Sequence, residues 1–331
     1  MYGRRRRRAL VGALLVLLLA GWAFAQGSRS TSAAARHALN DTGRNHVSAV
    51  RWPQHGQAAL VLGNGRPTAS PHQQPVAIAS LAKVMAADLT LERYPLSGAQ
   101  DGFTIIVSEA QAQAVAEEAR QGQSVVAVQA GERLTERQLL EALLIPSGNN
   151  IAEMLAARVA GSQTRFVAEM NTEARALRMD HTRYTDPSGF DPSTVSTAAD
   201  QLRVFRRAMR FPVFRQITSM PSVTLPVAGT LTNFNPLIGE GYSGKTGSDS
   251  AAGGCLAFFT HATVGGRRMT AVGVVTGQGQ GSDTSVLLGA AGEAAQQMVD
   301  SVALAISVPS RPEAPRPRPP VARASRPTRN G

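Results

Sequence analysis

Residues 241–259 read GYSGKTGSDSAAGGCLAFF, in which a lysine set among small residues precedes an apolar run. Lys245 stands out because the chain has 34 basic residues and only two of them, Lys83 and Lys245, are lysines. Glycine lets a second backbone approach closely, while Lys245 and Thr246 offer an ammonium and a hydroxyl to an anionic group. We therefore expect Gly244-Lys245-Thr246-Gly247 to lie on an accessible edge strand.

The apolar run opens a strand-rich final third of the chain. Residues 255–261 and 268–275 are apolar and are separated by Val-Gly-Gly at 264–266, which predicts a hairpin. Residues 58–62 form another short apolar run that ends at a Gly-Asn-Gly turn, and a closing helix is expected over 285–306. Strands at both ends with helices between them predict an α+β fold, in which an antiparallel sheet contains both ends of the folded region.

Helical periodicity occupies the middle of the chain. Apolar residues at 81, 84, 85, 89 and 91 predict a helix over 79–94. Thr135 and Gln138 have the spacing of a capping box at the start of a helix over 135–144. Further helices are expected over 151–159, 166–177 and 198–209.

Lys83 lies three residues after Ser80 at the start of a predicted helix, so the two side chains project from one face. A serine hydroxyl becomes a nucleophile when a neighbour accepts its proton, and a lysine whose pKa is lowered by burial can do so. Arginine cannot, because its pKa stays above about 12. The backbone N–H of Ser80 is also free there to stabilise an oxyanion. On its own this spacing also fits a helix-surface pair.

Ser147-Gly148-Asn149 lies in the loop IPSGNN between two predicted helices. A loop presents side chains to a cleft, where a hydroxyl can relay a proton and an amide can hold a peptide-like carbonyl. By itself the tripeptide is also typical of a simple turn.

Several other chemistries are disfavoured. The six histidines are scattered without metal-ligand spacing, so we expect no metal, and we expect no cofactor. A phosphate loop at 239–246 would contain the bulky Tyr242, and no magnesium-ligand strand follows it. Cys255 is the single cysteine, so no intrachain disulfide can form.

The net charge of +11 is concentrated at the two ends of the chain. Five arginines at 4–8, and a tail at 309–331 with six arginines and one glutamate, leave about +1 for residues 26–308. That distribution argues against a nucleic-acid partner. Residues 1–25 have the layout of a cleaved signal peptide or a retained membrane anchor, which places the rest outside the cytoplasm.

We divide the chain into this leader, a linker over 26–45, a folded domain over 46–308 and a disordered Pro/Arg-rich tail over 309–331. The tail is either a solvated terminus or a tether to anionic wall polymer or lipid, so the termini are candidates for membrane or cell-wall attachment.

The three motifs that contain Ser80, Ser147 and Lys245 are far more informative together than singly, because they occur in this order at separations of 67 and 98 residues. The set is that of penicillin-binding proteins and serine β-lactamases. The chain resembles the low-molecular-mass penicillin-binding proteins, specifically the serine D-alanyl-D-alanine carboxypeptidases. The similar blocks are IASLAKVMAADLTLE, GERLTERQLLEALLIPSGNNIAEMLA, HTRYTDPSGFD and GYSGKTGSDSAAGGCLAFF.

The resemblance implies a sheet flanked by helices with an inserted all-helical subdomain, a peptidoglycan stem peptide ending in D-Ala-D-Ala as substrate, and inhibition by β-lactams. Ser80 would attack the penultimate D-alanine carbonyl with Lys83 as base, and Ser147 would relay the proton to the leaving group. The remaining roles would be substrate binding by Asn149, Lys245, Thr246 and Gly247, and an oxyanion hole formed by the backbone N–H groups of Ser80 and Ser248.

Three departures from the family pattern stand out. The family usually has threonine at the position of Ala82, some relatives carry an arginine in the stretch that is TGQGQGSD here (276–283), and several have a β-rich second domain. Two other functions stay open. A class A β-lactamase needs a glutamate where this chain has TDPSGFDP, and a non-catalytic peptidoglycan-binding protein would tolerate loss of both lysines.

Overall fold

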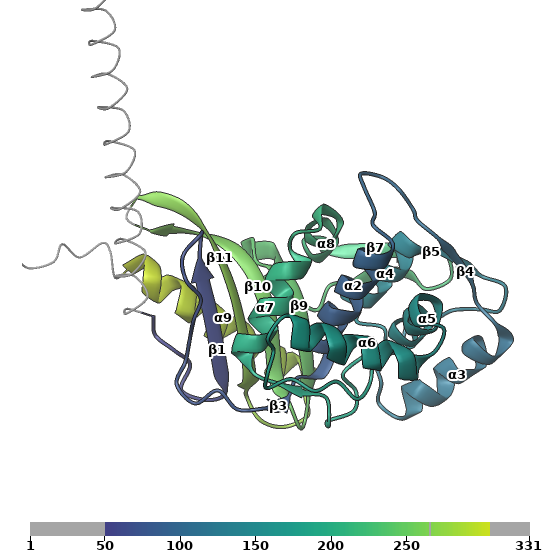
Figure 1. Ribbon diagram of the computed structural model, residues 1–331, viewed down its shortest axis with the longest axis horizontal. Helices are drawn as coiled ribbons and strands as arrows, with labels where there is room; N and C mark the ends of the chain where they lie inside the picture. The colour runs from purple at the N-terminus through teal and green to yellow at the C-terminus, as the bar shows by residue number, and fades with distance from the viewer. Residues whose placement is uncertain (1–49, 265, 305–331) are drawn as a thin grey trace, which may run out of the picture.

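The computed structural model describes residues 50–264 and 266–304 (Figure 1). Its centre is a five-stranded sheet in the order β2-β1-β11-β10-β9. The strands are β1 (Gln57–Leu62), β2 (Thr68–Ala69), β9 (Ser243–Asp249), β10 (Gly253–Val264) and β11 (Arg267–Gln278). Every pairing in it is antiparallel, and β1 pairs with β11 from Gln57↔Thr276 to Leu62↔Ala271. The prediction that the two ends of the folded region share one sheet is confirmed.

The strand β9 carries the Gly-Lys-Thr-Gly motif and pairs on one side with β10, with Lys245 opposite Ala257. Within the described sheet its other side has no strand neighbour. The predicted edge position of the motif is therefore confirmed, but residues 243–247 are buried, so the expected accessibility of this strand is not observed. The predicted hairpin is also present, since Val264 pairs with Arg267 where β10 turns into β11.

Strand β1 is buried on both faces, and its alternate side chains enter two different cores. Ala58, Leu60 and Leu62 pack with the apolar face of α9 (Thr284–Leu304). Ala59 and Val61 face the larger core, which is shared with the helices. Because side chains alternate across a strand, one short apolar run joins both layers.

The helices between β1 and β9 form the second part of the molecule, and Figure 1 shows α3, α5 and α6 at the end remote from β1. The helices are α2 (Ala82–Arg93), α3 (Glu109–Arg120), α4 (Glu136–Leu144), α5 (Asn149–Ala160), α6 (Gln163–Ala176), α7 (Ala198–Ala208) and α8 (Pro212–Thr218). Helix α7 contacts β1 and β11, and α2 contacts α4, α5, α6 and α7. The helix that carries Lys83 is thus held inside the molecule.

The predicted capping box at the start of α4 is confirmed. The Thr135 hydroxyl accepts from the Gln138 N–H, and the Gln138 amide oxygen accepts from the Thr135 N–H. The apolar face of α4 is buried, so the helix delivers the loop after Leu144 to a fixed place.

The insert contains elements that the sequence patterns did not predict, including α3, α8 and three two-stranded sheets. These sheets pair β3 (Val76–Ala77) with β6 (Val195–Ser196), β4 (Thr104–Ile106) with β5 (Arg133–Thr135), and β7 (Ser222–Leu225) with β8 (Gly229–Thr232). Helix α3 has no fully buried residue, so it has no apolar stripe of the kind that reveals a helix in sequence.

Across the described residues, no helix combines the length and apolar character needed to span a membrane. The predicted leader, linker and tail lie outside the described residues.

Candidate active site

Ser80 lies in a single 3-10 turn, η1 (Ala79–Leu81), that leads directly into α2. Lys83 follows one turn later, and its Nζ is 2.7 Å from Ser80 Oγ. The contact expected from the i, i+3 spacing is confirmed. The helix starts in 3-10 form and not in α form, and Ala79 before the serine has a positive φ of 45°. The serine thus lies at a tight turn at the start of a buried helix.

Lys83 is fully buried and its Nζ has three oxygen neighbours. Besides Ser80 Oγ, they are Asn149 Oδ1 at 2.6 Å and the Ser188 carbonyl oxygen at 3.1 Å. An ammonium has three N–H groups, so the charged form would be satisfied here. In the neutral amine, two N–H groups still serve Asn149 and Ser188, and the lone pair faces the Ser80 hydroxyl.

Ser147 occupies the predicted loop between α4 and α5, with a positive φ of 65°. Its Oγ accepts a hydrogen bond of 2.9 Å from Lys245 Nζ. A non-glycine residue at such a φ costs about 1–3 kcal/mol, which is typical of functional turns. Asn149 begins α5, so one loop supplies side chains to both lysines.

Lys245 is fully buried on β9 and donates 2.9 Å hydrogen bonds to Ser147 Oγ and to the Thr246 carbonyl. The same strand passes close to the nucleophile candidate. A Cβ placed on Gly247 would lie 3.0 Å from the backbone nitrogen of Ser80 and 3.1 Å from the Ile78 carbonyl oxygen. Glycine thus permits a close approach of the strand to Ser80 without displacement of its neighbours, and Ser248 follows it on the strand.

Burial shifts the pKa of both lysines downward. Desolvation is the main cause for Lys83, and the nearby Lys245 lowers its pKa further, while Asp186 acts in the opposite direction. Burial and Lys245 outweigh Asp186, so the pKa of Lys83 lies well below its usual value. Burial lowers the pKa of Lys245 to about 7. In the described part of the chain neither lysine forms an ion pair with a carboxylate.

The turn that carries Ser188 lies in a block that resembles the family, but the sequence assigned none of its residues to the site. Asp186 Oδ2 accepts hydrogen bonds from Ser188 Oγ at 2.6 Å and from the backbone N–H groups of Ser188, Gly189 and Phe190. Asp186 Oδ1 accepts from Thr194 Oγ1 at 2.6 Å. This carboxylate therefore folds the turn DPSGF and aims the Ser188 carbonyl at Lys83.

Gly189 lets the turn sit against the start of η1. It has a φ of +81°, and a Cβ there would lie only 1.8 Å from the Ala79 carbonyl oxygen and 3.0 Å from the Ala82 Cβ. Glycine is therefore required at position 189 for the turn to pack this closely against η1.

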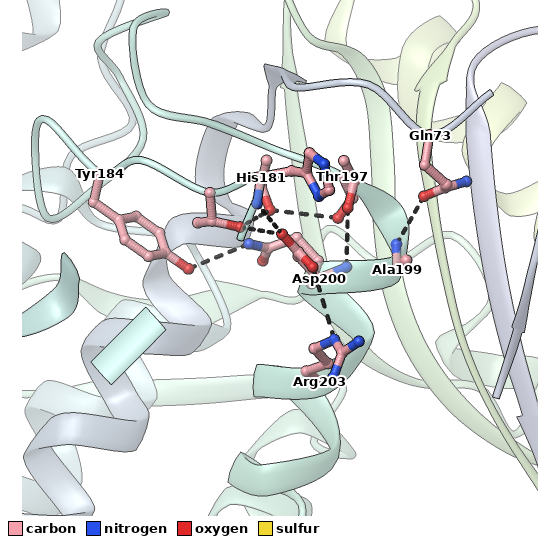
Figure 2. A network of polar contacts seen from close by, with 10 residues as sticks. Gln73, His181, Tyr184, Thr197, Ala199, Asp200 and Arg203 are labelled. Carbon is pink, nitrogen blue, oxygen red and sulfur yellow. Dashed lines mark hydrogen bonds and ion pairs between the residues drawn. The ribbon is translucent and has the colours of Figure 1, made fainter. Parts of the chain in front are cut away.

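The segment before this turn is anchored on the N-terminus of α7, as Figure 2 shows. Asp200 accepts hydrogen bonds from the His181 N–H at 2.9 Å and from Thr182 Oγ1 at 3.0 Å. Gln201 donates to the Tyr184 hydroxyl at 3.2 Å. The Gln73 amide oxygen caps the Ala199 N–H at 2.9 Å, which ties α7 to the loop after β2. These hydrogen bonds thus hold the chain segment that precedes Asp186 in place against α7.

The predicted site residues come together as two hydrogen-bonded groups. Ser80, Lys83 and Asn149 form one, and Ser147 and Lys245 form the other. Thr246 and Gly247 lie on β9 beside them, followed by Ser248. Among the described residues, no group of three or more histidine, cysteine, aspartate or glutamate side chains has the arrangement of a metal site.

A comparison with known protein families shows which family shares this arrangement of residues. The sequence profile of the D-alanyl-D-alanine carboxypeptidase family matches residues 67–278, which cover Ser80, Lys83, Ser147 and Lys245. The chain therefore belongs to the D-alanyl-D-alanine carboxypeptidase family. Its fold class, an α+β fold with an antiparallel sheet flanked by helices, is the one expected, while the insert, expected to be all-helical, also contains short two-stranded sheets.

Individual relatives agree with this assignment. D-alanyl-D-alanine carboxypeptidase DacB2 of Mycobacterium tuberculosis is 36% identical over 200 residues, which are 58% of this chain and 64% of the relative. A D-alanyl-D-alanine endopeptidase of Pseudomonas aeruginosa is 32% identical over 195 residues, 56% of this chain and 59% of the relative. The chain thus matches less than two thirds of the length of either protein.

A solved structure shows the same fold. The crystal structure of an evolved penicillin-binding protein homologue from Mycobacterium tuberculosis superimposes with a TM-score of 0.61 at 29% identity. The match covers 80% of this chain and 95% of that one.

Proposed function

We propose that this protein is a serine D-alanyl-D-alanine carboxypeptidase that cleaves peptidoglycan stem peptides through an acyl-enzyme at Ser80 and is inhibited by β-lactams. The observation that carries the proposal is the 2.7 Å contact between Ser80 Oγ and Lys83 Nζ, made in a site where burial lowers the pKa of the lysine. A lysine whose pKa is lowered in this way loses its proton more readily, and its neutral amine can take the serine proton during attack.

Acylation begins with transfer of the Ser80 proton to Lys83 as Oγ attacks the carbonyl carbon of the penultimate D-alanine. The oxyanion that forms would be held by the backbone N–H groups of Ser80 and Ser248, since β9 passes the Ser80 nitrogen at Gly247. Asn149 would hold the amide of the substrate. Lys245 and Thr246 would bind the terminal carboxylate, for which an ammonium and a hydroxyl are suitable partners.

Collapse of the tetrahedral intermediate breaks the C–N bond, and the leaving amine of D-alanine takes up the proton that Lys83 accepted from Ser80. Ser147 would relay it, a role supported by the hydrogen bond from Lys245 to its hydroxyl oxygen, which leaves the hydroxyl proton free to point into the site. Water then hydrolyses the ester and returns Ser80 to its free form.

The turn at Asp186 disfavours a class A β-lactamase. Rapid deacylation in that class needs a carboxylate that activates water. Here both oxygens of Asp186 are occupied by hydrogen bonds to Ser188, Gly189, Phe190 and Thr194. We therefore infer that a β-lactam acyl-enzyme persists.

The two buried lysines disfavour a non-catalytic binding protein. A buried ammonium without a carboxylate partner is costly, and burial depresses the pKa of both side chains. Burying Lys83 beside Ser80 lowers the stability of the folded protein. A protein that only binds peptidoglycan would have no catalytic function to offset that loss.

We further propose that the enzyme works outside the cytoplasmic membrane. The leader at 1–25 supports export, and the termini are candidates for attachment to membrane or wall.

Release of D-alanine from a short peptide ending in D-Ala-D-Ala tests the proposal. The purified protein is expected to release it, whereas the same peptide ending in L-Ala-L-Ala should remain intact. Peptide binding without any release of D-alanine would favour the non-catalytic alternative and contradict the proposal.

A further inference from the structure

Gln123 lies in the loop after α3 and contacts the site through Asn149. Asn149 Nδ2 donates a hydrogen bond of 2.9 Å to the Gln123 side-chain oxygen, while Asn149 Oδ1 accepts from Lys83 at 2.6 Å. Lys83, Asn149 and Gln123 thus form one chain of hydrogen bonds that ends at a residue outside the three sequence motifs. Gln123 is half-buried, in contrast to Lys83 and Asn149.

The hydrogen-bond inventory of Asn149 explains what this contact does. A side-chain amide has one acceptor oxygen and two N–H groups. The oxygen of Asn149 serves Lys83, and one N–H serves Gln123, so the second N–H remains for a ligand. If the amide were flipped, its NH₂ group would face an N–H of Lys83 and its oxygen would face the Gln123 oxygen, and both contacts would be repulsive.

The Gln123 amide is itself oriented by a neighbour. Its nitrogen donates to the Gln121 side-chain oxygen at 3.2 Å, so its oxygen is the atom left to face Asn149. The orientation of Asn149 is therefore fixed from both ends, by a donor at Lys83 and by an acceptor at Gln123.

The loop is held in place without the Gln123 side chain. The Asn149 N–H donates to the Ser124 carbonyl at 2.7 Å. The Asn150 amide accepts from the Val126 N–H at 3.0 Å and donates to the Val126 carbonyl at 2.8 Å. Because these bonds fix the backbone of the loop, a change confined to the Gln123 side chain can be separated from loss of the loop.

We propose that Gln123 is a positioning residue for the acylation reaction, which fixes the amide plane of Asn149 so that one N–H faces the substrate carbonyl. This inference rests on the proposed function, since it assigns a role in that same reaction. Gln123 acts through Asn149 and does not itself react.

The test uses Gln123→Leu, which removes the acceptor at similar size, and Gln123→Glu, which keeps an acceptor. The control is Gln113→Leu on α3, where the glutamine is exposed and bonds only to Glu109. The measurement is the second-order rate of acylation by benzylpenicillin across pH, together with kcat and KM for a D-Ala-D-Ala peptide. Thermal unfolding checks that each variant folds.

Gln123→Leu is expected to slow acylation about tenfold, mainly because a misoriented amide no longer fits the reacting geometry. Gln113→Leu should behave as the wild type does. Gln123→Glu should recover much of the rate at high pH, with the acid limb of its profile moved to higher pH. The reason is that a carboxylate two hydrogen bonds from Lys83 adds to the effect of Asp186 and opposes that of Lys245, so the Lys83 amine becomes neutral only at higher pH.

The outcomes separate the two proposals. Acylation of Gln123→Leu at the wild-type rate, or equal losses in both variants with an unmoved pH profile, would overturn the positioning role while leaving the carboxypeptidase proposal intact. Absence of any acylation in the wild-type protein would overturn both. If Gln123→Leu does not fold, the shift in the Gln123→Glu profile decides alone.

Discussion

Lys83→Arg is expected to lower the rate of Ser80 acylation by roughly 10³-fold, which is the range of a lost general base. The guanidinium keeps its proton at every pH at which the enzyme is folded, so it cannot accept the proton of Ser80. The lysine can, because burial and Lys245 hold its pKa well below the usual value. The measurement is the rate of acylation by a β-lactam as a function of pH.

The direction of the pH dependence follows from the base role. Below the pKa of Lys83 the amine is protonated and acylation is slow, and the rate rises as pH increases through that pKa. Lys83→Arg should lose this rise. Because arginine is larger and the site is fully buried, Lys83→Met serves as a second variant that removes the base without adding volume. An acylation profile unchanged in a folded Lys83→Arg protein would show that another group is the base.

Replacing Lys245 is expected to have the next largest effect, on binding of the substrate carboxylate. Lys245→Gln should raise KM for a D-Ala-D-Ala peptide by roughly 10- to 100-fold, the loss expected for a charge-assisted hydrogen bond. Arg267→Gln, an exposed cation at the other end of the sheet, is the matched control. A loss of the same size in both variants would indicate long-range attraction and not a specific contact.

The pKa of Lys245 gives this prediction a second readout. Burial lowers that pKa to about 7, so the free enzyme loses the ammonium as pH rises above about 7. Affinity for an anionic substrate is therefore expected to fall over that range. Lys245→Arg stays charged and should remove the fall, even if its affinity at low pH is reduced. An alkaline fall of the same size in Lys245→Arg would assign it to a different group.

The sequence predicted the parts of the site whose geometry is set locally. The Ser80–Lys83 contact follows from helical spacing, and the edge position of Lys245 follows from the small residues around it and the apolar run after it. The exclusive use of arginine elsewhere made both lysines conspicuous, and their burial gives this a physical reason, since only lysine changes charge readily on desolvation.

The parts that the sequence did not predict depend on contacts between distant segments. Asp186 acts by folding a turn that contains Ser188. The Ser188 carbonyl accepts a hydrogen bond from Lys83, which lies 105 residues earlier in the chain. Gln123 lies on a loop whose place is set by Asn149 and Asn150. Neither residue has a periodicity or spacing that distinguishes it from an ordinary loop residue, so only the folded structure brings them to the site.

The fold shows the same division. The sequence shows clear apolar patterns for β1, β10, β11 and α4, and these elements were predicted. Helix α3 has no buried residue, and each strand of the two-stranded sheets is only two to four residues long. Short strands carry too few alternations to be seen in a sequence. The roles assigned to the leader, the linker and the tail remain predictions.

The most direct test of the account is intact-mass spectrometry of the purified protein after addition of benzylpenicillin, followed over time and repeated with Ser80→Ala. We expect a covalent adduct of the mass of the antibiotic that persists in the wild-type protein and is absent from Ser80→Ala. An adduct that disappears rapidly with hydrolysis of the antibiotic would indicate a β-lactamase, and an adduct that survives in Ser80→Ala, or none in the wild type, would contradict acyl-enzyme formation at Ser80.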